Sequence, residues 1–66
     1  MLITVNGEPR EVEENLTLLA LMQEIGVKPE ITAAQRNEEI VDRKAVPSTH
    51  LLEGDAVELI RIVGGG

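Results

Sequence analysis

The chain has 66 residues with twelve acidic and six basic side chains, a net charge of −6 at pH 7, and neither cysteine nor aromatic residues. Without cysteine it forms no disulfide and offers no thiolate to a metal, and without aromatic rings it cannot stack on bases. Its negative charge repels phosphate backbones and anionic lipid surfaces, so we expect no nucleic-acid partner and no membrane partner. A basic protein surface suits this charge better.

The first fourteen residues, MLITVNGEPREVEE, are typical of a β-hairpin. Asn6-Gly7 is a turn sequence because both residues tolerate positive φ, and we assign it no role beyond the turn. Pro9 lacks an N–H donor and charged residues follow it, which favours an edge strand.

The segment TLLALMQEIG predicts a helix with Thr17 as its N-cap and Gly26 as its C-terminal stop. Its apolar side chains recur at helical spacing, so they share one face that must be buried. These core positions are Leu18, Leu21, Met22 and Ile25. The longest apolar run, LLALM, is too short to cross a membrane and no basic leader precedes it, so we expect a cytoplasmic protein.

The second half of the chain predicts three short strands. ITAAQRN and EEIV flank a turn at Asn37-Glu38, although alanine is a poor strand former. DRKAVPSTHLL is an irregular connection with a helical turn at 47–50, and the Gly54-Asp55 turn opens the last strand, DAVELIRIV. The order is therefore β-β-α-β-β-β, and a single helix covers only one face of the sheet.

The last strand has aliphatic side chains on both faces. Val57 and Leu59 project to one face, while Ile60 and Ile62 project to the other. Two interpretations stay open. Either the strand is central and covered on both sides, or Ile60, Ile62 and their neighbours form an exposed apolar patch that a partner covers.

The sequence ends on Gly64, Gly65 and Gly66. Glycine has no Cβ, so such a tail is thin, flexible and open to close approach by another backbone. Its α-carboxylate is a poor electrophile that requires activation, for instance as an acyl adenylate, before a nucleophile can attack it. The alternative is a frayed terminus without a function.

Other polar residues are weaker candidates for a functional site. Glu38, Glu39 and Asp42 lie close in sequence but lack the ordered ligand spacing of a calcium loop, so we interpret them as a solvated turn and expect no metal site. His50 has no serine or cysteine arrangement beside it, and we interpret it as a surface or packing residue.

Four stretches taken together resemble a known family: ITVNGE, TLLALMQEIG, RNEEIVDR and LLEGDAVELIRIVGGG. They resemble the ubiquitin-like, β-grasp sulfur carriers, and among these the ThiS family of thiamine biosynthesis. The family pattern is matched at Asn37, Ile40, Val41, Gly54, Asp55, Val63, Gly65 and Gly66. The resemblance implies an α+β fold, with a mixed sheet of four to five strands crossed by one helix. It implies a single β-grasp domain over 1–63 and a flexible glycine tail at 64–66.

The resemblance also implies a mechanism in which the chain is a carrier and not an enzyme. An E1-like (ThiF-like) adenylyltransferase would use ATP and magnesium to adenylate the Gly66 carboxylate. Sulfur from a cysteine-desulfurase-derived donor would then displace AMP, and the resulting thiocarboxylate would deliver sulfur to a ThiG-like thiazole synthase. The carrier itself would bind no cofactor and be monomeric when free. Its partner interface would comprise Ile60, Arg61, Ile62 and Val63, with Arg61 facing an acidic patch of the partner.

Three alternatives share the fold. The molybdopterin-synthase small subunit uses the same terminal chemistry but serves another enzyme. A ubiquitin-like modifier would join Gly66 to lysines of other proteins. A pure binding module would have an inert tail.

Overall fold

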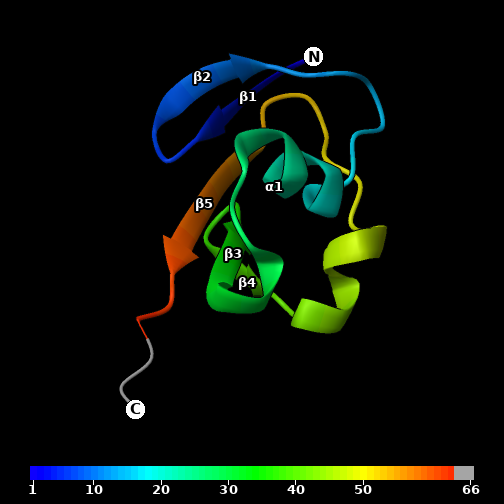
Figure 1. The fold of residues 1–66 in the computed structure, drawn as a ribbon. Helices are drawn as coiled ribbons and strands as arrows, with labels where there is room; N and C mark the ends of the chain where they lie inside the picture. The colour runs from blue at the N-terminus through cyan, green and yellow to red at the C-terminus, as the bar shows by residue number, and fades with distance from the viewer. Residues whose placement is uncertain (64–66) are drawn as a thin grey trace.

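The computed structural model describes residues 1–63, so the prediction of a flexible tail at Gly64–Gly66 lies outside the described residues. Within residues 1–63, one α-helix and five strands follow one another in the predicted order β-β-α-β-β-β (Figure 1). The elements are β1 (Leu2–Val5), β2 (Glu8–Glu11), α1 (Leu18–Ile25), the 3₁₀ helix η1 (Pro29–Ile31), β3 (Thr32–Arg36), β4 (Glu39–Val41), the 3₁₀ helix η2 (Arg43–Ser48) and β5 (Ala56–Arg61).

The five strands form one mixed sheet in the order β2-β1-β5-β3-β4. β1 and β5 run parallel, whereas the pairs β1–β2, β3–β5 and β3–β4 are antiparallel. The hairpin strand β2 lies at an edge, as Pro9 and its charged neighbours predicted. β5 lies at the centre of the sheet and is paired on both sides.

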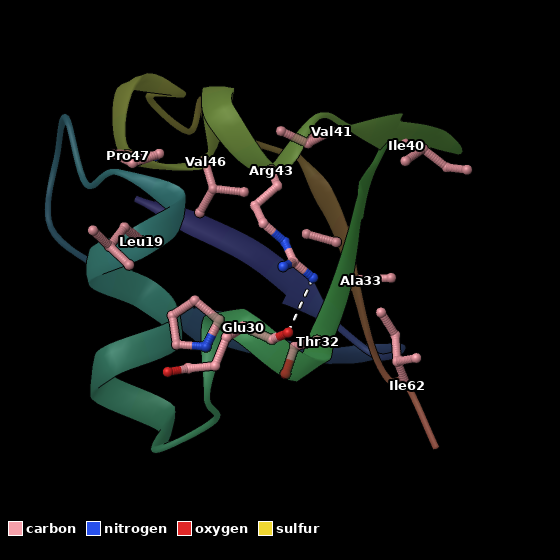
Figure 2. Close-up of a pocket in the computed structure, with 12 residues that line it drawn as sticks. Leu19, Glu30, Thr32, Ala33, Ile40, Val41, Arg43, Val46, Pro47 and Ile62 are labelled. Carbon is pink, nitrogen blue, oxygen red and sulfur yellow. Dashed lines mark hydrogen bonds between the residues drawn. The ribbon is translucent and has the colours of Figure 1, made fainter. Parts of the chain in front are cut away.

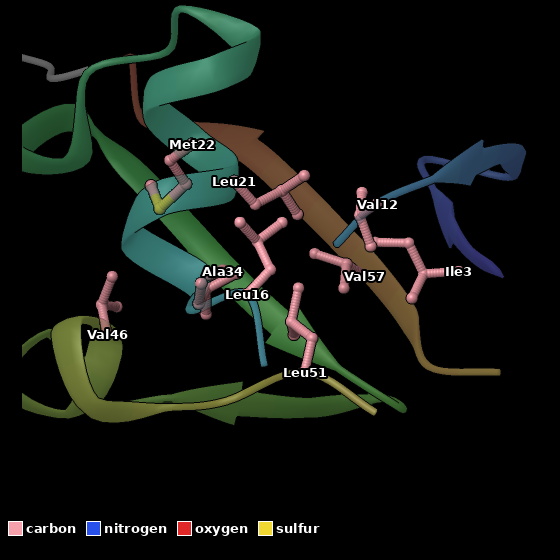
Figure 3. Packing of buried hydrophobic residues seen from close by; sticks show 10 residues of the cluster. Ile3, Val12, Leu16, Leu21, Met22, Ala34, Val46, Leu51 and Val57 are labelled. Carbon is pink, nitrogen blue, oxygen red and sulfur yellow. The ribbon is translucent and has the colours of Figure 1, made fainter. Parts of the chain in front are cut away.

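Helix α1 packs against one face of this sheet and supplies much of the core (Figure 3). The Thr17 hydroxyl accepts a hydrogen bond from the Ala20 N–H, and Gly26 ends the helix at a φ of 92°, so both predicted boundaries are confirmed. Six large side chains are almost fully buried, and they come from the helix, two strands and the chain before β5. They are Ile3, Leu18, Leu21, Met22, Leu51 and Val57.

Two local expectations needed correction. The helical turn predicted at 47–50 is instead the longer η2, which begins at Arg43, because the Asp42 side chain accepts a hydrogen bond from the Lys44 N–H and starts the turn early. Ile25 is only partly buried, since it occupies the last position of the helix and reaches the margin of the core.

The alanine-rich strand β3 forms in spite of its weak strand propensity. It pairs with β5 from Thr32 to Arg36 and with β4 from Ala34 to Arg36. Pairing on both sides and the burial of Ala34 therefore outweigh local preference. Over residues 1–63, no helix has the length and apolar composition that crossing a bilayer demands.

Candidate functional site

The outer face of β5 ends in exposed aliphatic side chains. Val57, on the inner face, is 1% exposed, whereas Ile60 on the outer face is 48% exposed. Ile60 lies opposite Ala33 of β3, and Ile40 of β4, which is 76% exposed, lies one strand further along the same face. The outer face of β5 is therefore exposed at Ile60 and Ile62, and that a partner covers these side chains stays a prediction. We call Ile40, Ile60, Ile62 and Val63 the outer patch; all four are exposed.

A cavity of about 450 Å³ adjoins the outer patch on the β4 side (Figure 2). It is lined by α1, η1, β3, β4 and η2, and most of its lining is apolar, including Leu19, Val46 and Pro47. Ile40 and Ile62 of the outer patch also line it. The Arg43 Nη2 donates a hydrogen bond of 3.0 Å to the Glu30 carbonyl oxygen and so links η2 to η1 across this cavity.

Hydrogen bonds from both sides fix β5 up to the point where the described chain ends. The Asn6 Oδ1 accepts a bond of 2.8 Å from the Leu59 N–H, and the Asn6 N–H donates to the Val57 carbonyl at 2.8 Å. Asn6-Gly7 forms the predicted turn, and Asn6 also continues the β1–β5 ladder, a structural role beyond the turn that was not predicted. On the other side, the Ile62 N–H donates to the Ile31 carbonyl at 2.7 Å.

At the other end of β5, the buried Asp55 is the centre of a polar cluster that was not predicted from the sequence. Its carboxylate accepts hydrogen bonds from Arg36 Nε at 2.8 Å, Asn37 Nδ2 at 3.0 Å and the Leu52 N–H at 2.8 Å. Burial raises the pKa of this carboxyl. The hydrogen bonds from Leu52 and Asn37 and the charge of Arg36 outweigh that effect, so the pKa of Asp55 lies below its usual value of 3.8.

Asn37 completes this cluster by accepting a hydrogen bond of 2.9 Å from the Ala56 N–H through its Oδ1. Asn37 and Glu38 both have positive φ, so the β3–β4 turn is tight and its first residue faces the start of β5. From the sequence, Asn37 and Asp55 were predicted to lie in two separate turns and to match the family pattern, but no contact between them was predicted. Their shared place in the family pattern was the available indication that they meet.

The remaining candidate residues lie apart from these features. Glu38 and Glu39 are exposed, Asp42 caps η2, and no group of acidic or histidine side chains within residues 1–63 has the arrangement of a metal site. His50 is exposed and forms an isolated bridge with Thr17. Gly64, Gly65 and Gly66 are outside the described residues.

A five-stranded mixed sheet crossed by one helix, with an exposed apolar patch at the end of its central strand, defines a β-grasp protein. The sequence model described as the ThiS family matches residues 3–66. The chain therefore belongs to the ThiS family, in which the resemblance had placed it.

Similar proteins support this assignment along the whole chain. The sulfur carrier protein ThiS of Thermus thermophilus is 37% identical over 65 residues, which cover 98% of this chain and 100% of the relative. The crystal structure of the thiamine biosynthesis protein ThiS from Geobacter metallireducens superposes with a TM-score of 0.87 at 36% identity, and the match covers 100% of both chains.

Two larger relatives contain a region similar to this chain. A thiazole synthase of Magnetococcus marinus is 38% identical over 66 residues, and one of Paramagnetospirillum magneticum is 35% identical over 66 residues. The match covers 100% of this chain and 20% of each relative, so the chain spans about a fifth of their length.

Proposed function

We propose that this chain carries sulfur, as a thiocarboxylate on Gly66, to the enzyme that forms the thiazole ring of thiamine. The observation behind the proposal is that the match to the ThiS family extends to residue 66 and so includes the glycine tail. The exposed end of β5 supports it, because the outer patch lies immediately before Gly64 and offers an apolar surface to whichever protein receives the tail.

The proposed chemistry occurs on the terminal carboxylate while partner enzymes supply every catalytic group. A carboxylate oxygen of Gly66 attacks the α-phosphate of ATP in an E1-like adenylyltransferase, and magnesium pyrophosphate leaves. A persulfide from the cysteine-desulfurase-derived donor attacks the acyl carbon and expels AMP. A second thiol then cleaves the sulfur–sulfur bond, which leaves the thiocarboxylate on Gly66 and a disulfide as the other product.

In this proposal the chain is a co-substrate rather than an enzyme and works in the cytoplasm as a free monomer. ATP and magnesium belong to the activating enzyme. Ile60, Ile62 and Val63 form the contact surface, and Arg61 faces an acidic patch on the partner. The thiazole synthase is the proposed acceptor, since two thiazole synthases contain a region similar to this chain.

The first prediction concerns the mass of the purified protein. We expect chain isolated from cells with an active pathway to show replacement of one oxygen by sulfur at the C-terminus in intact-mass spectra. A variant that lacks Gly66 is the control and should show no replacement. Covalent ladders with other proteins, without any thiocarboxylate, would indicate the ubiquitin-like modifier instead.

The second prediction identifies the pathway. Deletion of the gene should create a requirement for thiamine that the intact gene relieves and a copy without the Gly66 codon does not. A defect in molybdenum enzymes, with normal growth in the absence of thiamine, would assign the chain to molybdopterin synthesis.

A further inference from the structure

We propose that Lys28, Arg43 and Arg61 bind an acidic rim around the site where a partner protein receives the tail. The inference rests on the proposed function, since it concerns the protein that takes up the tail. It adds the chemistry of the partner surface and two residues, Lys28 and Arg43, that the sequence analysis did not select. We call these three side chains the tail-root cations.

The tail-root cations line two cavities that flank the end of β5. Arg43 lines the cavity of about 450 Å³ together with Ile62, and Lys28 and Arg61 line a second cavity of about 290 Å³ between the end of α1 and β5. Thr32 lines both, so the two cavities adjoin at the start of β3. Ile62 lines the first cavity and Arg61 the second, so both cavities lie beside the C-terminal end of β5.

The charge around these cavities is opposite to that of the whole molecule. The chain has twelve acidic and six basic residues, yet three of the basic residues and only one acidic residue, Glu30, line the two cavities. The ion pairs found in residues 1–63 involve Arg10, Arg36 and the N-terminal ammonium, and none involves a tail-root cation. Within residues 1–63, Arg43 donates to a main-chain carbonyl and no carboxylate of this part of the chain pairs with it.

The apolar lining between these charges favours a protein segment as the occupant over a free anion. Leu19, Val46 and Ile62 lie beside Arg43, and Ile31 and Leu59 lie beside Lys28 and Arg61. Aliphatic surface with cations at its margin is complementary to apolar side chains flanked by carboxylates. Binding of such a rim would orient the carrier so that residue 63 faces the entrance of the acceptor site.

Charge reversal at each cation provides the test. We expect Lys28→Glu, Arg43→Glu and Arg61→Glu each to weaken binding to the thiazole synthase of the same organism by about three- to tenfold at low ionic strength, and less at high salt. Lys44→Glu is the matched control, because Lys44 is exposed on η2 beside Arg43 but lines neither cavity. Isothermal titration calorimetry at two salt concentrations measures the effect.

A further variant distinguishes an effect of the lost charge on binding from an effect of the substitution on folding. Arg43→Gln removes the charge and shortens the side chain, so the bond to the Glu30 carbonyl is lost as well. Because that bond is exposed to solvent, thermal unfolding should stay near that of the wild type while binding weakens. If the three reversals weaken binding no more than Lys44→Glu, or if the wild type does not bind the synthase, the inference is wrong. Loss of adenylation with unchanged binding would likewise overturn it and assign the cations to nucleotide phosphates.

Failure of the inference about the cations can be distinguished from failure of the proposed function. A wild-type chain that acquires the thiocarboxylate, with variants that bind as the Lys44→Glu control does, contradicts only the inference about the cations. A wild-type chain that never acquires sulfur contradicts the proposed function itself.

Discussion

Asp55 shows how much a single side chain can organise in a domain of this size. Its carboxylate joins the turn before β5 to the β3–β4 turn, through bonds to Leu52, Arg36 and Asn37. Only 5% of the residue is exposed, so water cannot replace partners that a substitution removes. The aspartate of a Gly-Asp turn is thus a structural centre here rather than a turn former alone.

The third prediction follows from the lowered pKa of Asp55. Because the folded carboxyl has a pKa below its unfolded value of 3.8, its ionised form stabilises the fold above that pH, and the stabilisation is lost as pH falls through the folded pKa. We expect Asp55→Asn to lower the free energy of unfolding at pH 7 by about 2 kcal/mol. The difference from the wild type should shrink as the pH falls below 3.8 in urea titrations.

Glu58→Gln is the control for this experiment. Glu58 is also a carboxylate of the β5 region, but it is exposed on the outer face. Its substitution should leave the free energy of unfolding at pH 7 almost unchanged. If the free energy of unfolding of the wild type and of Asp55→Asn falls equally as the pH is lowered, the ionisation of Asp55 does not determine how stability depends on pH in acid.

Whether a contact could be predicted from the sequence depends on how far apart its two residues lie along the chain. Thr17 and Gly26 act on their own helix, and Asn6-Gly7 acts on its own hairpin, so the sequence was enough to place them. The bond from Leu59 to Asn6 joins residues 53 positions apart, and that from Arg36 to Asp55 joins residues 19 apart. Such contacts depend on strand order, which short-range patterns do not encode.

At the scale of elements, β5 has two faces with opposite roles. Val57 is fully enclosed by the helix side of the core, while Ile60, three residues later, lies on the outer face. Alternation along the strand predicted which side chains share a face but not which face the helix covers. The exposure of Ile60 therefore cannot be predicted from the sequence alone, because it depends on how the sheet is assembled.

The fourth prediction compares these two positions. Ile60→Asp should change the free energy of unfolding by less than about 1 kcal/mol, because the side chain is already half exposed. It should weaken binding to the activating enzyme and to the thiazole synthase about tenfold, as expected for loss of an apolar contact at an interface. Circular dichroism and titration calorimetry measure the two effects.

Val57→Asp is the contrasting variant. It places a carboxylate in the core without a partner, and we expect it to unfold the domain. If Ile60→Asp unfolds as well, Ile60 contributes to packing rather than to an interface. If Ile60→Asp folds and binds as the wild type does, the outer patch is not the contact surface.

At the scale of the whole molecule, net charge turned out to be an incomplete guide to partners. A charge of −6 favours a basic partner surface in general, whereas the cavities at the end of β5 are lined by three cations and one carboxylate. Salt limits the reach of exposed charges to about 10 Å, so a docking protein responds mainly to the charges it touches. The order of the charges in the sequence does not reveal this grouping, because Lys28, Arg43 and Arg61 come from three different elements or loops.

The central position of β5 also has a mechanical consequence. A partner that draws in the chain beyond Val63 pulls along the axis of a strand that is paired with β1 on one side and β3 on the other. Such a load shears several hydrogen bonds at once, whereas a load on an edge hairpin would open them one after another. A pull on the C-terminal end of β5 would therefore have to break its bonds to both neighbouring strands together before the strand could leave the sheet.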